Sequence, residues 1–182
     1  MRKLTNDELG RITQADFRQK EKTPLVIVLD NVRSMNNIGS IFRTADAFLI
    51  EAIYLCGISA CPPHREIEKT ALGATSTVTW KHFKNASEAI QELKQRNYII
   101  VAVEQTDSNI PLNKFFPSQE KKYALIFGHE MNGVSEEAIQ LSDFSIEVPQ
   151  YGTKHSLNIA VCAGVVVWDF YSKMLGGNND IK

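Results

Sequence analysis

Short apolar runs alternate with longer segments of helical periodicity along most of the chain. The runs are partly β-branched and end at turn or charged residues; they cover positions 25–29, 53–55, 98–103, 123–127 and 145–148. Apolar residues at consecutive rather than alternate positions are typical of strands that are covered on both faces. The run at 76–80 predicts a sixth strand or a sheet edge.

Helical spacing of apolar residues predicts helices between and after these runs. The expected helices cover 38–49 with Asn36 or Asn37 as N-cap, 86–96 after Asn85, 135–141, and 157–174. Strands that alternate with helices predict an α/β fold, in which a mostly parallel sheet carries helices on both faces. A polar stretch over 4–20 predicts one more helix before the first strand, with Thr5 and Glu8 as its capping box.

We expect one domain with short appendages. With 182 residues the chain is long enough for a single sizeable core. The pattern divides it into an N-terminal helical segment over 1–22, a folded domain over 23–176 and a flexible tail over 177–182.

The last predicted helix is apolar on nearly all sides, and its first charged residue is Asp169. A helix that packs on a sheet with one side only should carry a polar stripe on the other. Either this helix is buried completely within the monomer, or a second copy of the chain covers it. We favour a homodimer through the C-terminal helix.

Composition places the chain among ordinary globular proteins, with 43% hydrophobic and 23% charged residues. No apolar run approaches the ~20 residues of a membrane span, and the N-terminus lacks an apolar signal region, so we expect a cytoplasmic protein without membrane contact. The cysteines Cys56, Cys61 and Cys162 form no CxxC pair, which indicates free thiols. Cys56, Cys61 and His64 lack a second pair of ligands, so no metal site is expected.

Charge alone does not decide whether the chain binds nucleic acid. Its net charge is −1, whereas a non-specific binder usually has a basic balance. Local patches matter more than the sum, and basic residues gather near the N-terminus at Arg2, Lys3, Arg11, Arg18, Lys20 and Lys22.

Three polar loops follow predicted strands, and each leads into a predicted helix. Ligands of open α/β sheets bind beyond the carboxyl ends of the strands, so the three loops together indicate a site. The first loop and helix hold Asn37, Gly39 and Arg43. Asn37 alone could be a plain N-cap, and Arg43 alone a surface salt bridge. An Arg just behind a strand end can nevertheless reach a phosphate or a ribose.

The second loop follows the strand that ends at Phe127 and holds Gly128, Glu130 and Gly133. Because Gly128 has no side chain, we expect a ligand to lie against the backbone there. An ordinary strand–turn–helix connection would carry similar turn residues.

The third loop runs from Val148 to Asn158 and is broken by Pro149 and Gly152. Its polar side chains lie beside an apolar helix, where they need a ligand or a capping role: Lys154, His155, Ser156 and Asn158. Ser156 or His155 could cap the helix and do nothing more. His155 could also act as a general acid or base, or face solvent beside Lys154.

In their order and spacing these loops resemble the three motifs of the TrmH (SpoU-like) branch of the SPOUT superfamily of RNA methyltransferases. Asn37, Gly39 and Arg43 match the first motif, and Gly128, Glu130 and Gly133 match the second. The third motif is matched by Val148, Pro149, Gly152, Ser156, Leu157 and Asn158, with Gln150 where the family usually has Met. The resemblance covers about residues 24–174.

The resemblance implies a C-terminal trefoil knot, a homodimer, and S-adenosylmethionine as cofactor for methylation of a ribose 2′-hydroxyl of tRNA or rRNA. The implied catalytic residues are Arg43, Asn37, Glu130, Ser156 and Asn158. The implied cofactor-binding residues are Phe127, Gly128, Gly133, Val148, Pro149, Gly152 and Leu157. In this interpretation Arg43 contacts the attacking hydroxyl or the adjacent phosphate, and Glu130 holds Arg43 or the nucleotide.

Three other functions compete with this one. A non-catalytic RNA-binding or assembly protein could keep the same fold, although Asn37, Arg43, Glu130 and Asn158 together argue against it. An unrelated nucleotide-binding enzyme would need a GxGxxG or P-loop pattern, and the sequence has neither. Methylation at a base instead of a ribose is the third alternative, and the related branch that does this has differently built motifs.

Overall fold

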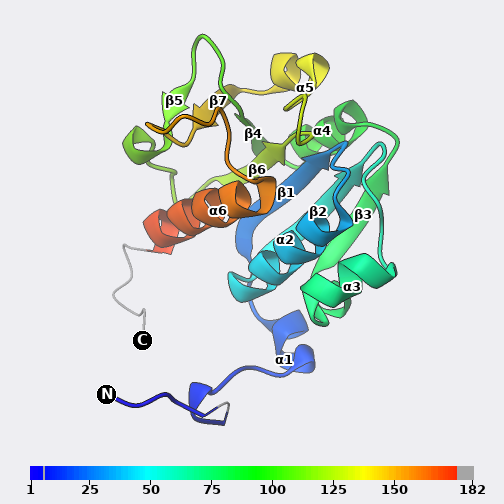
Figure 1. Ribbon diagram of the computed structural model, residues 1–182, viewed down its shortest axis with the longest axis vertical. Coiled ribbons are helices and arrows are strands. Elements are labelled where there is room, and N and C mark those ends of the chain that lie inside the picture. Colours follow the sequence, from blue (N-terminus) through cyan, green and yellow to red (C-terminus); the bar gives the residue numbers. More distant parts are fainter. Residues whose placement is uncertain (6, 176–182) are drawn as a thin grey trace.

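A single seven-stranded sheet forms the centre of the molecule (Figure 1). The computed structural model describes residues 1–5 and 7–175. Every paired neighbour in the sheet is parallel, in the order β3-β2-β1-β6-β4-β7-β5. The strands are β1 (Thr23–Asp30), β2 (Ile50–Cys56), β3 (Thr79–Phe83), β4 (Tyr98–Val103), β5 (Ile110–Pro111), β6 (Lys122–Phe127) and β7 (Phe144–Glu147).

Helices cover both faces of this sheet, as the sequence predicts. The helices are α1 (Gln14–Gln19), α2 (Met35–Ala47), α3 (Arg65–Ala71), α4 (Ala86–Gln95), α5 (Glu136–Leu141) and α6 (Ile159–Leu175), with short 3₁₀ turns η1 (Asp7–Leu9), η2 (Ala74–Ser76) and η3 (Leu112–Lys114). Buried side chains of α1, α2, α3 and α6 share one core with the sheet, and those of α4 and α5 share the core on the other face. The α/β class with a parallel sheet is therefore confirmed.

Several local predictions need correction. Helix α2 begins earlier than expected, because the Ser34 side chain accepts a hydrogen bond from the Asn37 N–H and is the N-cap in place of Asn36 or Asn37. The run at 76–80 is partly 3₁₀ turn, and its strand, β3, lies later at the sheet edge. Helix α3 and strand β5 were not predicted, because β5 has only two residues and α3 buries only Ile67 and Ala71, too few apolar positions to show a period. The predicted tail over 177–182 lies outside the described residues.

The N-terminal segment is two short pieces instead of one helix over 4–20. The predicted capping box is present, with the Thr5 N–H donating to Glu8 Oε2 at 2.8 Å and the Glu8 N–H donating to Thr5 Oγ1 at 3.4 Å. It closes only the turn η1, and Gly10, in a left-handed conformation at φ +57°, separates this turn from α1. Phe17 of α1 is buried in the core of the domain, so this segment is packed against it.

Gly39 allows α3 to pack closely on α2. A Cβ atom at Gly39 would lie 2.2 Å from the Ile67 carbonyl oxygen and 2.1 Å from Thr70 Oγ1. The reason for glycine at this position is thus helix packing.

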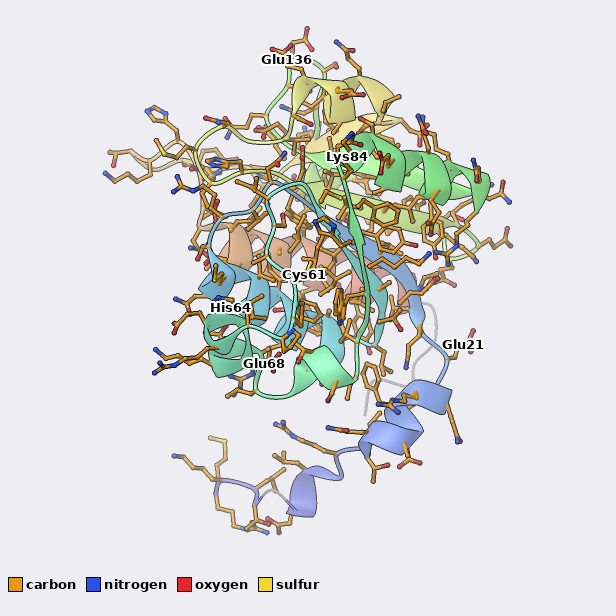
Figure 2. All side chains as sticks on the ribbon, turned by 90° about the vertical axis from the view of Figure 1, so that its right-hand side faces the viewer. Glu21, Cys61, His64, Glu68, Lys84 and Glu136 are labelled. Carbon is orange, nitrogen blue, oxygen red and sulfur yellow. The ribbon has the colours of Figure 1, made fainter. Side chains whose placement is uncertain are left out.

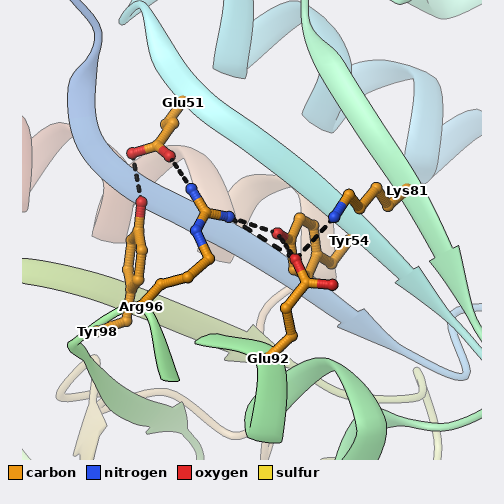
Figure 3. Close-up of polar contacts among 6 residues, drawn as sticks. All are labelled: Glu51, Tyr54, Lys81, Glu92, Arg96 and Tyr98. Atoms are coloured by element: carbon orange, nitrogen blue, oxygen red, sulfur yellow. Dashed lines mark hydrogen bonds and ion pairs between the residues drawn. The ribbon is translucent and has the colours of Figure 1, made fainter. Parts of the chain in front are cut away.

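A polar network joins α4 to the strands β2, β3 and β4 (Figure 3). Its six side chains are Glu51, Tyr54, Lys81, Glu92, Arg96 and Tyr98. Arg96, the C-cap of α4, joins that helix to β2 by donating to Glu51 Oε1 at 2.6 Å and to the Tyr54 hydroxyl at 2.7 Å. Burial and a hydrogen bond to Glu92 raise the pKa of Tyr54 to about 12, so its hydroxyl stays protonated and remains a donor.

Helix α6 exposes an apolar face, so complete burial within one chain is wrong. Val161, Val165 and Trp168 follow one another at helical spacing and are 55%, 41% and 49% exposed. The opposite side of α6, including Val166 and Phe170, is fully buried. In the part of the chain that the structure describes, no helix is long and apolar enough to cross a membrane.

Candidate functional site

All three polar loops lie at the same edge of the sheet, where parallel strands have their carboxyl ends. A cavity of about 530 Å³ opens there, beyond the ends of β4, β6 and β7. Its lining residues are Val103, Glu104, Gln105, Phe127, Gly128, His129, Glu130, Met131, Asn132, Gly133, Ile146, Glu147, Val148, Gln150, His155, Ser156, Leu157, Asn158, Ile159 and Cys162.

A chain of hydrogen bonds joins the three predicted loops. Asn158 Nδ2 donates to Asn37 Oδ1 at 3.2 Å, and Asn37 Nδ2 donates to Glu130 Oε1 at 3.3 Å. The three side chains come from positions up to 121 residues apart in sequence. The structure therefore brings together one residue from each predicted motif.

Asn158 has two roles in this arrangement. Its Oδ1 accepts hydrogen bonds from the Ala160 N–H at 2.9 Å and the Val161 N–H at 3.3 Å, so it caps the N-terminus of α6. The suggestion that Ser156 or His155 caps this helix is therefore wrong. Because Asn158 Oδ1 faces the helix, its Nδ2 group points towards Asn37 and acts there as a donor.

Glu130 fastens the start of α2 to the second loop. It accepts hydrogen bonds from the Arg33 N–H at 3.1 Å and from the Ser34 N–H at 2.9 Å. Burial acts to raise the pKa of Glu130, but these donors and Asn37 outweigh it and lower the pKa below its usual range. The ionised Glu130 carboxylate therefore stabilises the folded state at a pH above about 4.3, the pKa of Glu in the unfolded chain. This stabilisation is lost as the pH falls through the lower pKa that Glu130 has in the folded protein. In this structure Glu130 therefore binds the backbone just before α2, and it does not bind the Arg43 side chain.

Gly128 is required for a close contact between two backbone segments. A Cβ atom there would lie 2.0 Å from the Gly133 carbonyl carbon and 2.1 Å from the Val134 nitrogen. His129 and Gly133 exchange backbone hydrogen bonds of 2.9 and 2.8 Å, which folds the loop back on itself. The space on the Cβ side of Gly128 is thus filled by the protein's own chain, while Gly128 also lines the cavity.

Gly128→Ala is expected to lower the free energy of unfolding by about 1–3 kcal/mol, because the new methyl group overlaps backbone that cannot rotate away. Urea unfolding followed by circular dichroism measures this change. The matched control is Gly152→Ala, where no atom lies within 4 Å of the added Cβ and stability should stay within about 0.5 kcal/mol. Equal stability of the two variants would contradict the role given to Gly128.

Arg43 lies outside the cavity. It lies in α2, is exposed, and borders two surface hollows that share no lining residue with the cavity. No hydrogen bond or ion pair joins Arg43 to another described residue, so it is not a surface salt bridge within the chain. Pro149 and Gly152 also lie outside the lining, whereas Ser156, Leu157 and the other predicted cofactor-binding residues are part of it.

The cavity has an acidic and partly apolar character. Glu104, Glu130 and Glu147 line it, and no Lys or Arg does so among the described residues. Glu104 is fixed by the Val134 N–H at 2.9 Å and the Gln105 N–H at 2.9 Å. This lining suits a ligand that carries positive charge and an apolar ring, and it does not suit a polyphosphate.

Sequence reasoning missed Glu104 and Glu147. Glu104 directly follows β4, and Glu147 is the last residue of β7. A carboxylate at or just after the end of a buried strand is the same signal that identified Glu130. A Cβ atom at Gly133 would lie 2.2 Å from Glu104 Oε2, so this carboxylate also explains why the last residue of the second motif is glycine. Among the described residues, no group of three or more His, Cys, Asp or Glu side chains is arranged to hold a metal ion.

Comparison with known proteins places this geometry in a family. Residues 24–168 match the model of the SpoU rRNA methylase family, and this range contains every motif residue discussed above. The chain belongs to the SpoU rRNA methylase family. The resemblance to TrmH-type methyltransferases that the motifs indicate is thereby confirmed.

Relatives within the SpoU family are similar over most of this chain. A TrmH-family protein of Staphylococcus epidermidis is 29% identical over 87% of this chain and 64% of its own length. The tRNA (guanosine(18)-2′-O)-methyltransferase of Aquifex aeolicus is 28% identical over 83% of this chain and 70% of its own length. The chain therefore spans about two thirds of the length of these relatives.

A solved structure shows the same fold. The SpoU methyltransferase AviRb from Streptomyces viridochromogenes, crystallised with AdoMet, superposes with a TM-score of 0.78 at 21% identity. The superposition covers 89% of this chain and 65% of that one.

Proposed function

We propose that this protein is an S-adenosylmethionine-dependent RNA methyltransferase that modifies a ribose 2′-hydroxyl of tRNA or rRNA. The observation that carries the proposal is the acidic cavity at the strand ends. The second and third family motifs line it, and Asn37 of the first motif is joined to their residues Glu130 and Asn158 by hydrogen bonds. The relatives named for tRNA methylation and the AdoMet-bound neighbour support it.

The residues of the cavity fit S-adenosylmethionine. A volume of about 530 Å³ lies within the ~300–1,000 Å³ range of small-molecule sites. Val103, Ile146 and Leu157 offer an apolar slot for the adenine ring, and Glu104 and Glu147 offer negative charge to the sulfonium and ammonium groups. The bound cofactor supplies a methyl group on a positively charged sulfur, which an oxygen nucleophile can displace.

The protein's own groups would position the RNA and stabilise charge. A guanidinium has five donors and no acceptor, so we assign Arg43 to holding the ribose or the adjacent phosphate and not to removing a proton. Asn37 would be oriented for the same nucleotide by Glu130 and Asn158, and Ser156 would add a hydroxyl at the cavity mouth.

We further propose that two copies of the chain complete each site. Arg43 does not reach the cavity of its own chain, and α6 exposes an apolar face that a second copy can cover. In this arrangement Arg43 of one subunit faces the cavity of the other.

The family resemblance also supports a trefoil knot around the loop that leads into α6. A cytoplasmic location, where three free cysteines stay reduced, belongs to the same proposal.

Methyl transfer is tested directly with tritium-labelled S-adenosylmethionine and total RNA from a strain that lacks the gene. Label in one RNA class, released on digestion as a 2′-O-methylated nucleoside, supports the proposal. A methylated base would assign a different reaction. Cofactor binding by calorimetry without transfer to any RNA would favour the non-catalytic RNA-binding protein.

Subunit mixing tests whether sites form between two chains. Arg43→Ala leaves the cavity intact, and Val148→Arg places a positive charge in the cavity lining while keeping Arg43. Each variant alone should be inactive. Refolding them together at equal amounts should restore about a quarter of the wild-type rate, because half of the dimers are mixed and each mixed dimer has one intact site.

No recovery in the mixture, with mixed dimers verified by native mass spectrometry, would show that each chain uses its own Arg43. Wild type mixed with Val148→Arg is the control for refolding yield, and calorimetry confirms that Val148→Arg no longer binds the cofactor.

A further inference from the structure

Arg43 separates two hollows on the surface of α2. The first, of about 680 Å³, lies between α2 and the N-terminal segment that includes α1. The second, of about 520 Å³, lies between α2 and α3. Arg43 lines both of them, so the two hollows meet at this side chain.

Each hollow contains one further cation. Arg11 lines the first hollow and Lys69 lines the second. Both side chains are exposed, and neither has a hydrogen bond or ion pair with another residue in the described ranges. Arg11, Arg43 and Lys69 therefore form a row of cations, called here the basic track.

Few carboxylates oppose the basic track. Asp46 lines the first hollow, where Thr77 Oγ1 donates to it at 2.6 Å. The lining of the second hollow, as far as the chain is described, contains no acidic residue. Glu68 on α3 accepts a hydrogen bond from Thr75 at 2.8 Å; Figure 2 shows Glu68 on the side of the domain that faces the N-terminal segment.

The basic track and the cofactor cavity have opposite electrostatic character. The cavity has three carboxylates and no Lys or Arg in its described lining, whereas the track has three cations. A polyanion is therefore attracted to the hollows beside Arg43 and repelled from the cavity. The second hollow also presents hydroxyl oxygens from Ser40, Thr44 and Thr70, which can accept hydrogen bonds from ribose hydroxyls.

We propose that the basic track binds the phosphodiester backbone of the RNA on both sides of the modified nucleotide. Arg11 and Lys69 are then substrate-positioning residues that hold flanking phosphates while Arg43 contacts the nucleotide itself. This inference rests on the proposed function for the identity of the polyanion. It assigns the N-terminal segment a direct part in substrate binding through Arg11.

The test measures RNA affinity at several salt concentrations for Arg11→Gln, Lys69→Gln and the double variant, with bulk tRNA as the probe. Removing one cation that binds a phosphate should reduce the slope of log affinity against log salt by about 0.7–0.9, and the double variant should reduce it by about twice that. The matched control is Lys84→Gln, an exposed lysine at the opposite end of the domain in Figure 2, which should leave the slope unchanged.

Methyl transfer is measured in parallel and separates this inference from the proposed function. The substitutions should raise the KM for RNA with little change in kcat, and cofactor affinity by calorimetry should stay at the wild-type value. Slopes equal to that of Lys84→Gln would overturn the basic track even if methyl transfer is fully established. Reduced slopes would support the track even in the absence of transfer, because binding is measured independently.

Discussion

Replacing Arg43 by alanine is expected to lower kcat for methyl transfer by about 10²–10³-fold, the usual cost of removing one group that stabilises charge in a transition state. Cofactor affinity should not change, because Arg43 lies outside the cavity lining. Stability should not change either, since Arg43 is exposed and has no partner among the described residues. Single-turnover transfer, calorimetry and thermal unfolding measure the three quantities.

Arg43→Lys is the matched variant. Lysine keeps the positive charge but loses the planar fork with which Arg contacts two oxygens at once, so it should recover only part of the rate. Near-normal turnover of Arg43→Ala with cofactor binding intact would remove Arg43 from the mechanism. Loss of cofactor binding would instead mean that Arg43 contributes to the cavity of the assembled protein.

Val165→Lys is expected to convert the protein to monomers and to reduce methyl transfer by more than about 100-fold. Val165 is 41% exposed at the centre of the apolar face of α6, between Val161 and Trp168. A charge buried without a partner in a subunit interface costs several kcal/mol, whereas in a monomer the lysine simply faces water. The loss of activity follows because a single chain does not bring Arg43 to its own cavity.

Analytical ultracentrifugation over a range of protein concentrations measures the assembly state, and the transfer assay is run on the same samples. Gln91→Lys adds the same charge at an exposed position of α4, on the other face of the sheet, and should affect neither property. A fully active monomer would show that each chain contains a complete site. A dimer that persists in Val165→Lys would place the interface elsewhere.

Much of the fold was predictable because its strands and long helices have clear patterns in the sequence. Strands such as 98–103 are buried on both faces and form unbroken apolar runs. The start of α4 directly after Asn85 was also predicted correctly, and the structure shows the Asn85 side chain as its N-cap. The two-residue strand β5 and helix α3, which buries only Ile67 and Ala71, have too few apolar positions to show a pattern and depend on tertiary contacts.

The site was predictable in its membership and less so in its geometry. Motif spacing identified Asn37, Glu130 and Asn158, but only the structure shows that they bond to one another. The close backbone contact at Gly128 was not foreseen, because a sequence cannot show which atoms take the place of a missing side chain. Arg43 lies away from the cavity, and a motif does not show whether its residues meet within one chain or between two.

The position of Asn158 has a consequence for biosynthesis. The segment 148–162, which leaves the ribosome after all seven strands of the sheet, supplies one wall of the cavity and the final donor in the chain of hydrogen bonds through Asn37. A nascent chain can already pair β1 with β2 and β6, yet it has no closed cavity for the cofactor. Ligand binding therefore cannot assist the early steps of folding during synthesis, and a product truncated before residue 148 would consist of a sheet without a site.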